Sequence, residues 1–212
     1  MPQQQFGARG ADPRPSRLWL AETTLRFVRQ SQTAEVLNPA LRPPNEMNRF
    51  SINAATETDV PLLLALIREL AEFEHLVHEV AVTAASLREA LFGERPVATA
   101  LLAVVDGRAV GYAVYYRTFS TFVGRAGVFL EDLYVQPAYR KRGLGRALLE
   151  EVAAVDAAAG GGRFEWIALR WNENAFRFYR SLGAKVMEEW ALLRMNGKEV
   201  SNLVSAKVKV GA

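Results

Sequence analysis

The pattern of apolar and polar positions becomes regular from about Arg49 onward. Apolar runs and alternating positions predict strands over residues 50–54, 97–105, 109–116, 128–135, 164–170, 186–195 and 200–208. Apolar positions that recur every three or four residues predict helices over residues 62–73, 84–91, 144–155 and 173–182. The order of elements is therefore β-α-α-β-β-β-α-β-α-β-β, which describes an α/β chain built on a mixed sheet.

Capping and turn residues indicate where several of these elements begin. Pro61 suits the first turn of the first helix, and Thr83 and Asn172 are N-cap residues for the second and fourth helices. Asp106-Gly107 predicts a tight hairpin turn between the second and third strands. Asn196-Gly197 predicts another such turn, so we expect the chain to close with a hairpin.

Residues 1–46 differ in composition from the rest of the chain. They hold six of the nine prolines, and six arginines against four acids. This composition is typical of a disordered or loosely attached extension, whereas the acids disfavour an organelle transit peptide and no apolar stretch suits a secretory signal. We therefore expect an N-terminal extension over 1–46 and a globular domain over 47–212, with Met47 as an alternative start of translation.

Composition excludes several classes of function. The 212 residues are half hydrophobic and 23% charged, as in an ordinary globular protein, and no apolar run is long enough to span a membrane. The formal charge of +3 is not concentrated in one basic stretch, which disfavours a nucleic-acid partner. There is no cysteine, so disulfides, thiolate metal sites and a cysteine nucleophile are excluded. We expect a cytoplasmic protein.

Only two histidines are available for a metal site or a catalytic triad. His75 and His78 have an i, i+3 spacing that suits a metal ion, but surface or packing histidines are far more common at such positions. We therefore expect no metal.

A basic turn with two glycines joins the apolar strand over 128–135 to the next helix. It consists of Arg140, Lys141, Arg142, Gly143, Leu144, Gly145 and Arg146. Free amides and the positive end of a helix dipole bind anions, and glycine lets phosphate oxygens approach the backbone closely. No Lys-Ser/Thr pair closes the turn, which disfavours a P-loop. The turn predicts phosphate binding, and a solvated loop is the simpler alternative.

The R-x-x-G-x-G spacing of this turn and the element order over about residues 49–208 resemble the GNAT superfamily of N-acetyltransferases. The resemblance implies the acyl-CoA N-acyltransferase fold and acetyl-CoA as cosubstrate, with its pyrophosphate on the turn over 140–146. It also implies that the backbone of Leu133, Tyr134 and Val135 pairs with the pantetheine arm, and that Leu133 serves the oxyanion.

The segment from Trp171 to Tyr179 is similar to a narrower branch, the diamine (spermidine/spermine) N-acetyltransferases and their thialysine-acetylating relatives. The shared pattern is W-N-x-x-A-x-x-x-Y. In that branch the tyrosine is the general acid, so the resemblance assigns protonation of the CoA thiolate to Tyr179 and places Asn172 at the cofactor. A tyrosine beside Phe176 and Phe178 also fits an ordinary core stripe, which is the alternative.

Carboxylates that match the same branch imply a cationic substrate. The resemblance assigns amine binding to Phe73, Glu74, Glu131, Asp132 and Trp190. Glu131 is expected to contact the amine and to help remove its proton, although a solvated acid near a strand end is the alternative. Successive residues of a regular strand face opposite sides, so Glu131 and Asp132 are not expected to share one cleft.

The resemblance also implies partners. They are acetyl-CoA, a small amine and a second copy of the chain, because the branch builds its amine site at a subunit interface. The acidic run after the first helix holds fewer carboxylates than in the branch, which favours a diamine, a thialysine-like amine or another small amine over a long polycation. The alternatives are a non-catalytic acyl-CoA-binding regulator and acetylation of a peptide or protein amine.

Overall fold

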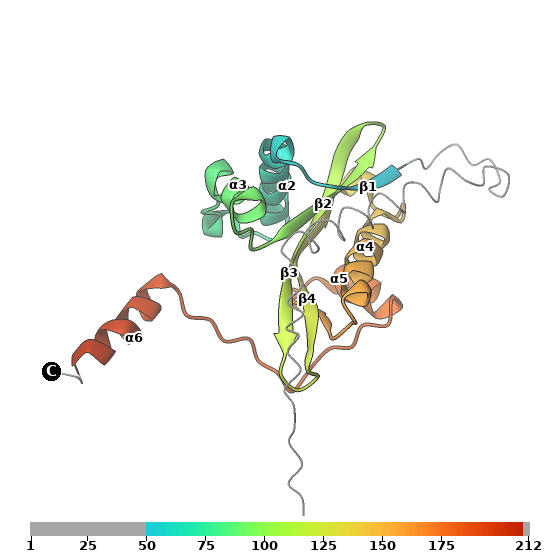
Figure 1. Ribbon diagram of the computed structural model, residues 1–212. Coiled ribbons are helices and arrows are strands. Elements are labelled where there is room, and N and C mark those ends of the chain that lie inside the picture. Colours follow the sequence, from blue (N-terminus) through green and yellow to red (C-terminus); the bar gives the residue numbers. More distant parts are fainter. Residues whose placement is uncertain (1–49, 210–212) are drawn as a thin grey trace, which may run out of the picture. The chain divides into compact units, whose positions relative to one another are not determined.

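The computed structural model describes residues 50–209, with side chains up to Ser205, so the predicted extension over 1–46 lies outside the described residues. The chain divides at Ile167 into two units, which are described separately below. Figure 1 labels their helices and strands. No helix within residues 50–209 combines the length and the apolar character that crossing a bilayer requires.

The first unit is built on one sheet with the strand order β1-β2-β3-β4-β5. The strands are β1 (Phe50–Ala54), β2 (Thr99–Val105), β3 (Arg108–Ser120), β4 (Arg125–Val135) and β5 (Phe164–Trp166). Neighbouring strands are antiparallel except β4 and β5, which are parallel. The mixed sheet and the Asp106-Gly107 hairpin turn are confirmed, although β3 and β4 are longer than predicted and β5 is shorter.

Helices cover both faces of this sheet. They are α2 (Val60–Phe73), α3 (Ala84–Phe92) and α4 (Leu144–Ala158), with short 3-10 turns at η1 (Glu57–Asp59), η2 (Val77–Glu79) and η3 (Pro137–Tyr139). As predicted, Thr83 caps α3, because its hydroxyl accepts a hydrogen bond from the Ser86 amide at 3.1 Å. The crossover that the parallel pair β4–β5 requires is supplied by α4.

Each face of the sheet carries its own apolar core. On one face, Leu63 and Leu66 of α2 pack with Tyr112, Val114 and Tyr134 of the central strands. On the other face, α4 buries Leu144, Leu148, Leu149 and Val152. The end of β4, the start of α4 and the turn that joins them are therefore anchored to packed elements.

A β-bulge interrupts the pairing of β3 with β4. Val114 pairs with Asp132 and the next residue, Tyr115, pairs with Leu130, so Glu131 has no partner on β3. Such an extra residue breaks the strict alternation of side chains along a strand. The expectation that Glu131 and Asp132 face opposite sides assumed a regular strand. Because β4 is irregular at Glu131, that assumption does not hold.

β4 and β5 are paired over a short stretch only. Their register joins Val128 to Phe164, Phe129 to Glu165 and Leu130 to Trp166. Beyond Leu130, no strand of the described chain pairs with this edge of β4. Backbone N–H and C=O groups over residues 131–135 are therefore open to a ligand on that side.

The second unit contains α5 (Glu173–Ser181) and α6 (Gly197–Lys209). Asn172 caps α5 as predicted, with Oδ1 accepting a hydrogen bond from the Ala175 amide at 3.1 Å. The predicted closing hairpin is wrong: residues 186–195, all of which are described, form no strand, and residues 200–208 lie within α6.

The reason for this difference lies at Asn196. Its Oδ1 accepts hydrogen bonds from the amides of Lys198 (3.0 Å) and Glu199 (3.3 Å), and the Glu199 carboxylate accepts one from the Asn196 amide (3.2 Å). These reciprocal bonds form a capping box, which begins a helix. Asn196-Gly197 is therefore a helix start and not a hairpin turn.

Candidate active site

The predicted phosphate-binding turn leads from the end of β4 through η3 into α4. Lys141 and Gly143 have positive φ angles of 64° and 89°, and Gly143 is the N-cap of α4. Residues in this conformation gather successive backbone N–H groups into a concavity that suits an anion. Because glycine has no side chain to cap the helix, the first amides of α4 stay available for a ligand. The turn thus has the backbone geometry of an anion site.

The arginines of the turn have partners within the first unit. The Arg140 guanidinium lies 4.7 Å from the ring centre of Phe73 and 5.6 Å from that of Tyr134, and its Nε donates to the Val135 carbonyl at 2.8 Å. Arg140, predicted at the cofactor, therefore contacts Phe73, predicted at the amine. The cation–π contacts link the turn to the last residue of α2.

Arg142 and Arg146 also have partners near the turn. The Arg142 guanidinium lies 5.4 Å from the ring centre of Tyr139, and Arg146 pairs with Glu150 at 2.7 Å. An exposed pair of this kind contributes little to stability, so Arg146 can exchange it for an anionic ligand. Positive charge is thus concentrated around the amides of the turn.

The open edge of β4 runs directly into this turn. Leu133, Tyr134 and Val135, which were predicted to present their backbone to the cofactor, lie on this edge. The Tyr134 hydroxyl donates to Glu69 of α2 at 3.2 Å, and Gln136 Nε2 donates to the same carboxylate at 3.0 and 3.1 Å. These bonds fix the end of β4 against α2 and leave its backbone edge free for pairing.

Three carboxylates gather near the bulge of β4. Asp132 is half-buried and Glu131 exposed on β4, while Glu74 is the C-cap of α2. Both Glu131 and Glu74 act electrostatically on Asp132. The structure therefore brings together three of the five residues predicted at the amine, although Glu74 is distant in sequence from the other two.

Burial raises the pKa of two members of this cluster, Asp132 and Glu74. Desolvation, with smaller effects from the charges of Glu131 and Glu74, raises the pKa of Asp132 to about 6. Desolvation also raises the pKa of Glu74. A carboxyl that titrates near neutral pH is suited to exchanging a proton with a substrate.

Sequence analysis missed one residue of this cluster, Tyr112 on β3. Its hydroxyl donates to Asp132 Oδ2 at 3.1 Å, and the side chain is fully buried. A partial signal was present, because a buried tyrosine in the run 109–116 needs a polar partner for its hydroxyl, but this run holds three tyrosines, at 112, 115 and 116. The identity of the partner depends on strand register, which the sequence does not show.

Tyr179, Asn172 and Trp190 belong to the second unit. The Tyr179 ring packs beside that of Phe178 on α5, with ring centres 5.3 Å apart, and no side chain of α5, all of it described, is fully buried. Tyr179 is therefore not sealed in a core. Trp190 is 66% exposed and lies between α5 and α6, outside any strand.

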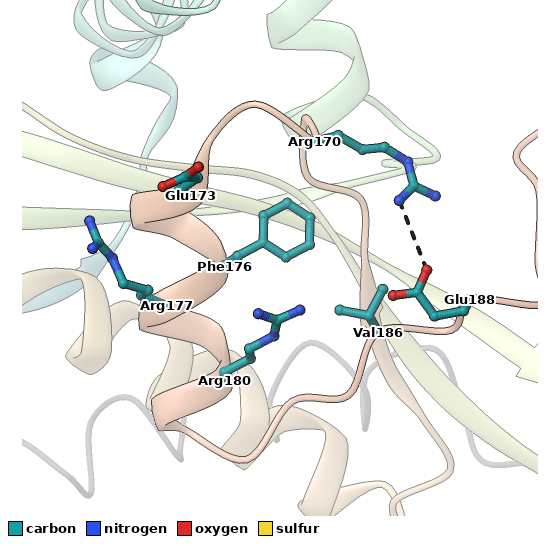
Figure 2. A pocket seen from close by; sticks show the side chains of 7 residues that line it. All are labelled: Arg170, Glu173, Phe176, Arg177, Arg180, Val186 and Glu188. Carbon is teal, nitrogen blue, oxygen red and sulfur yellow. Dashed lines mark ion pairs between the residues drawn. The ribbon is translucent and has the colours of Figure 1, made fainter.

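One pocket lies within the second unit and was not predicted (Figure 2). It has a volume of about 360 Å³ and is lined by Arg170, Glu173, Phe176, Arg177, Arg180, Val186 and Glu188. Phe176 points into it, and Arg170 and Glu188 approach to 3.9 Å across its rim. Most of its lining side chains are charged, and none of the predicted site residues lines it.

No group of three or more His, Asp or Glu side chains among the described residues is arranged to hold a metal ion. His78 Nε2 lies 3.5 Å from the Glu79 carboxylate, and both side chains are exposed.

The sequence matches an acetyltransferase family and several individual acetyltransferases. Residues 63–184 match the acetyltransferase (GNAT) family. The thialysine N-epsilon-acetyltransferase of Mus musculus is 37% identical over 163 residues, which cover 72% of this chain and 95% of that protein. The L-ornithine N5-acetyltransferase NATA1 of Arabidopsis thaliana is 29% identical over 204 residues, with coverage of 75% and 90%.

Similarity to solved structures concerns the fold. An integron cassette protein from the mobile metagenome of V. cholerae gives a TM-score of 0.62 at 23% identity, covering 73% of this chain and 97% of that one. The family match spans more than half of the sequence and includes the turn over 140–146, the carboxylate cluster and α5. The chain therefore belongs to the acetyltransferase (GNAT) family and is an N-acetyltransferase, an enzyme that transfers an acetyl group from acetyl-CoA to an amine.

Proposed function

We propose that the enzyme acetylates a small aliphatic amine, either a diamine, a polyamine or a thialysine-like amino acid. The observation that carries the proposal is the cluster of Glu74, Glu131 and Asp132 beside the open edge of β4. Three carboxylates favour a positively charged ligand over a neutral or anionic one. Support also comes from the relatives named for thialysine and L-ornithine.

In this proposal, acetyl-CoA occupies the turn and the open edge. Its pyrophosphate accepts hydrogen bonds from amides over 141–146, and Arg140, Lys141, Arg142 and Arg146 add positive charge. Its pantetheine arm pairs with the backbone over 133–135, with Asn172 near the cofactor. The positive φ angles at Lys141 and Gly143 and the unpaired edge of β4 support this placement.

The reaction follows from direct attack on the thioester. The amine loses a proton with the help of Glu131, directly or through water, and its nitrogen then attacks the carbonyl carbon. The Leu133 amide stabilises the negative charge on the oxygen. The C–S bond then breaks, and Tyr179 donates a proton to the departing thiolate. Phe73, Glu74, Asp132 and Trp190 complete the amine site.

An acetylation screen tests this function. Purified protein and acetyl-CoA are offered diamines, spermidine, spermine, thialysine, lysine, ornithine and a lysine-containing peptide, and release of free CoA is measured. We expect the highest kcat/KM with a small aliphatic amine that carries a positive charge. Turnover confined to the peptide would contradict the substrate class, and CoA binding without any turnover would identify a regulator.

We further propose that the enzyme works as a homodimer. Large apolar side chains are exposed over the segment from Met187 to Val204, and Leu193 is 90% exposed. A second copy of the chain that covers this segment would remove it from water. Light scattering after size exclusion is expected to give twice the monomer mass, and Leu193→Glu is expected to shift the protein toward monomer. A monomeric wild-type protein would contradict the proposal.

A further inference from the structure

Tyr112 has an unusual position for a polar side chain. It is the largest fully buried side chain of the described chain, and it packs among Leu63, Leu66 and Val114 on the α2 face of the sheet. A buried hydroxyl without a partner is costly, so its hydrogen bond defines its role. That bond goes to Asp132 Oδ2 at 3.1 Å.

Strand register explains why these two side chains meet. Tyr112 pairs with Tyr134, and Val114 pairs with Asp132, so Tyr112 and Asp132 are diagonal neighbours on one face. The bulge at Glu131 sets this register for the rest of β4. A ring as long as that of tyrosine spans the diagonal and places its hydroxyl on the carboxylate.

Tyr112 and the neighbouring acids shift the pKa of Asp132 in opposite directions. Burial, Glu131 on β4 and Glu74 at the end of α2 all raise the pKa of Asp132, whereas the hydrogen bond from Tyr112 lowers it. Burial and the Asp132 charge raise the pKa of Tyr112 well above its ordinary value, so its hydroxyl keeps its proton across the working pH range. Tyr112 is therefore a constant donor to the carboxylate.

We propose that Tyr112 is a positioning residue for amine acetylation: its buried hydroxyl holds the Asp132 carboxylate beside Glu74 and Glu131, where it receives the positive charge of the substrate. This inference rests on the proposed function. The hydrogen bond from Tyr112 then increases the fraction of Asp132 that is ionised near neutral pH.

The direction of the pKa change in Tyr112→Phe follows from the loss of the hydrogen bond to Asp132. Without the hydroxyl, the pKa of Asp132 rises further, and the carboxyl is protonated at a higher pH. For Tyr112→Phe, the acidic limb of kcat/KM is expected to move up by about one pH unit, with a loss of about fivefold near pH 6 and recovery to within about threefold of wild type above pH 8. A purely structural role would lower activity at every pH alike.

The experiment measures kcat/KM for the best amine of the screen between about pH 5.5 and 9. Tyr115→Phe is the matched control, since it removes a hydroxyl from another tyrosine of β3, three positions further along, which is also buried and lies on the opposite face. Its pH profile is expected to overlay that of the wild type. If the Tyr112→Phe profile also overlays it, or falls uniformly, the positioning role is overturned.

A second readout does not depend on turnover. Carbon-13 NMR follows the titration of the Asp132 carboxyl in the free protein, with Asp132→Asn used to assign the signal. We expect a higher midpoint in Tyr112→Phe than in the wild type and an unchanged midpoint in Tyr115→Phe. Equal midpoints would overturn the inference even if amines are acetylated. If the midpoint shifts but no amine is acetylated, the proposed function is contradicted, whereas the effect of Tyr112 on Asp132 is supported.

If Tyr112→Phe does not fold, Asp132→Asn provides the test. It removes the ionisable group and is expected to abolish the acidic limb near pH 6. Persistence of the same limb would show that another group titrates there and would overturn the inference.

Discussion

Replacing Tyr179 by phenylalanine is expected to lower kcat by about 10²-fold or more and to change the affinity for acetyl-CoA by less than about threefold. The substitution removes the proposed proton donor to the CoA thiolate. It keeps the aromatic ring, and with it the contact with Phe178. An interaction made only as the thiolate leaves affects turnover and not the binding of the cosubstrate.

Steady-state kinetics, calorimetric titration with CoA and thermal unfolding together check this result. Tyr115→Phe is again the matched control, because it loses a hydroxyl in the first unit, remote in sequence from α5. It is expected to keep the wild-type kcat. A parallel loss of kcat and CoA affinity in Tyr179→Phe would assign the residue to binding and contradict the proton-donor role.

Elements with local signals could be predicted from the sequence. The caps at Thr83 and Asn172 and the Asp106-Gly107 turn depend on residues within three positions of one another, and the structure contains all three. The basic turn is also a local feature, because strand, glycine and helix start follow one another in the chain. These signals sufficed for the fold class, and the phosphate site on the turn over 140–146 stays a prediction.

The arrangement of the carboxylates could not be predicted in the same way. Tyr112 and Asp132 are 20 residues apart, and their contact depends on a register that the bulge at Glu131 sets. A single extra residue in one strand leaves no mark in the apolar pattern of either strand. The sequence thus indicates which acids are present but not which of them a buried hydroxyl holds.

The C-terminal segment shows a different limit. Asn-Gly between two apolar stretches is a strong hairpin signal, yet the same asparagine serves equally well as a helix cap. The choice depends on Glu199, which completes the capping box. The apolar positions Val200, Leu203 and Val204 also have helical spacing, a signal that the hairpin prediction overlooked.

Replacing Gly143 by alanine is expected to weaken CoA binding about tenfold or more. Gly143 has a φ of 89°, a conformation that costs an alanine roughly 1–2 kcal/mol. No atom lies within 4 Å of the added methyl group, so packing is not disturbed. The chain either keeps the strained angle, with a methyl group close to the proposed phosphate site, or relaxes and turns the amides of the anion site away from the ligand.

Gly124→Ala separates this effect from general backbone strain. Gly124 lies in the turn between β3 and β4, has a φ of 68°, and likewise has no atom within 4 Å of the added methyl group. Both variants are expected to lose similar thermal stability, whereas calorimetry should show weaker CoA binding in Gly143→Ala alone. A strained or relaxed backbone at Gly143 should disturb any ligand that is bound by the amides of this turn. If the two variants bind CoA equally well, the pyrophosphate does not lie on the turn over 140–146.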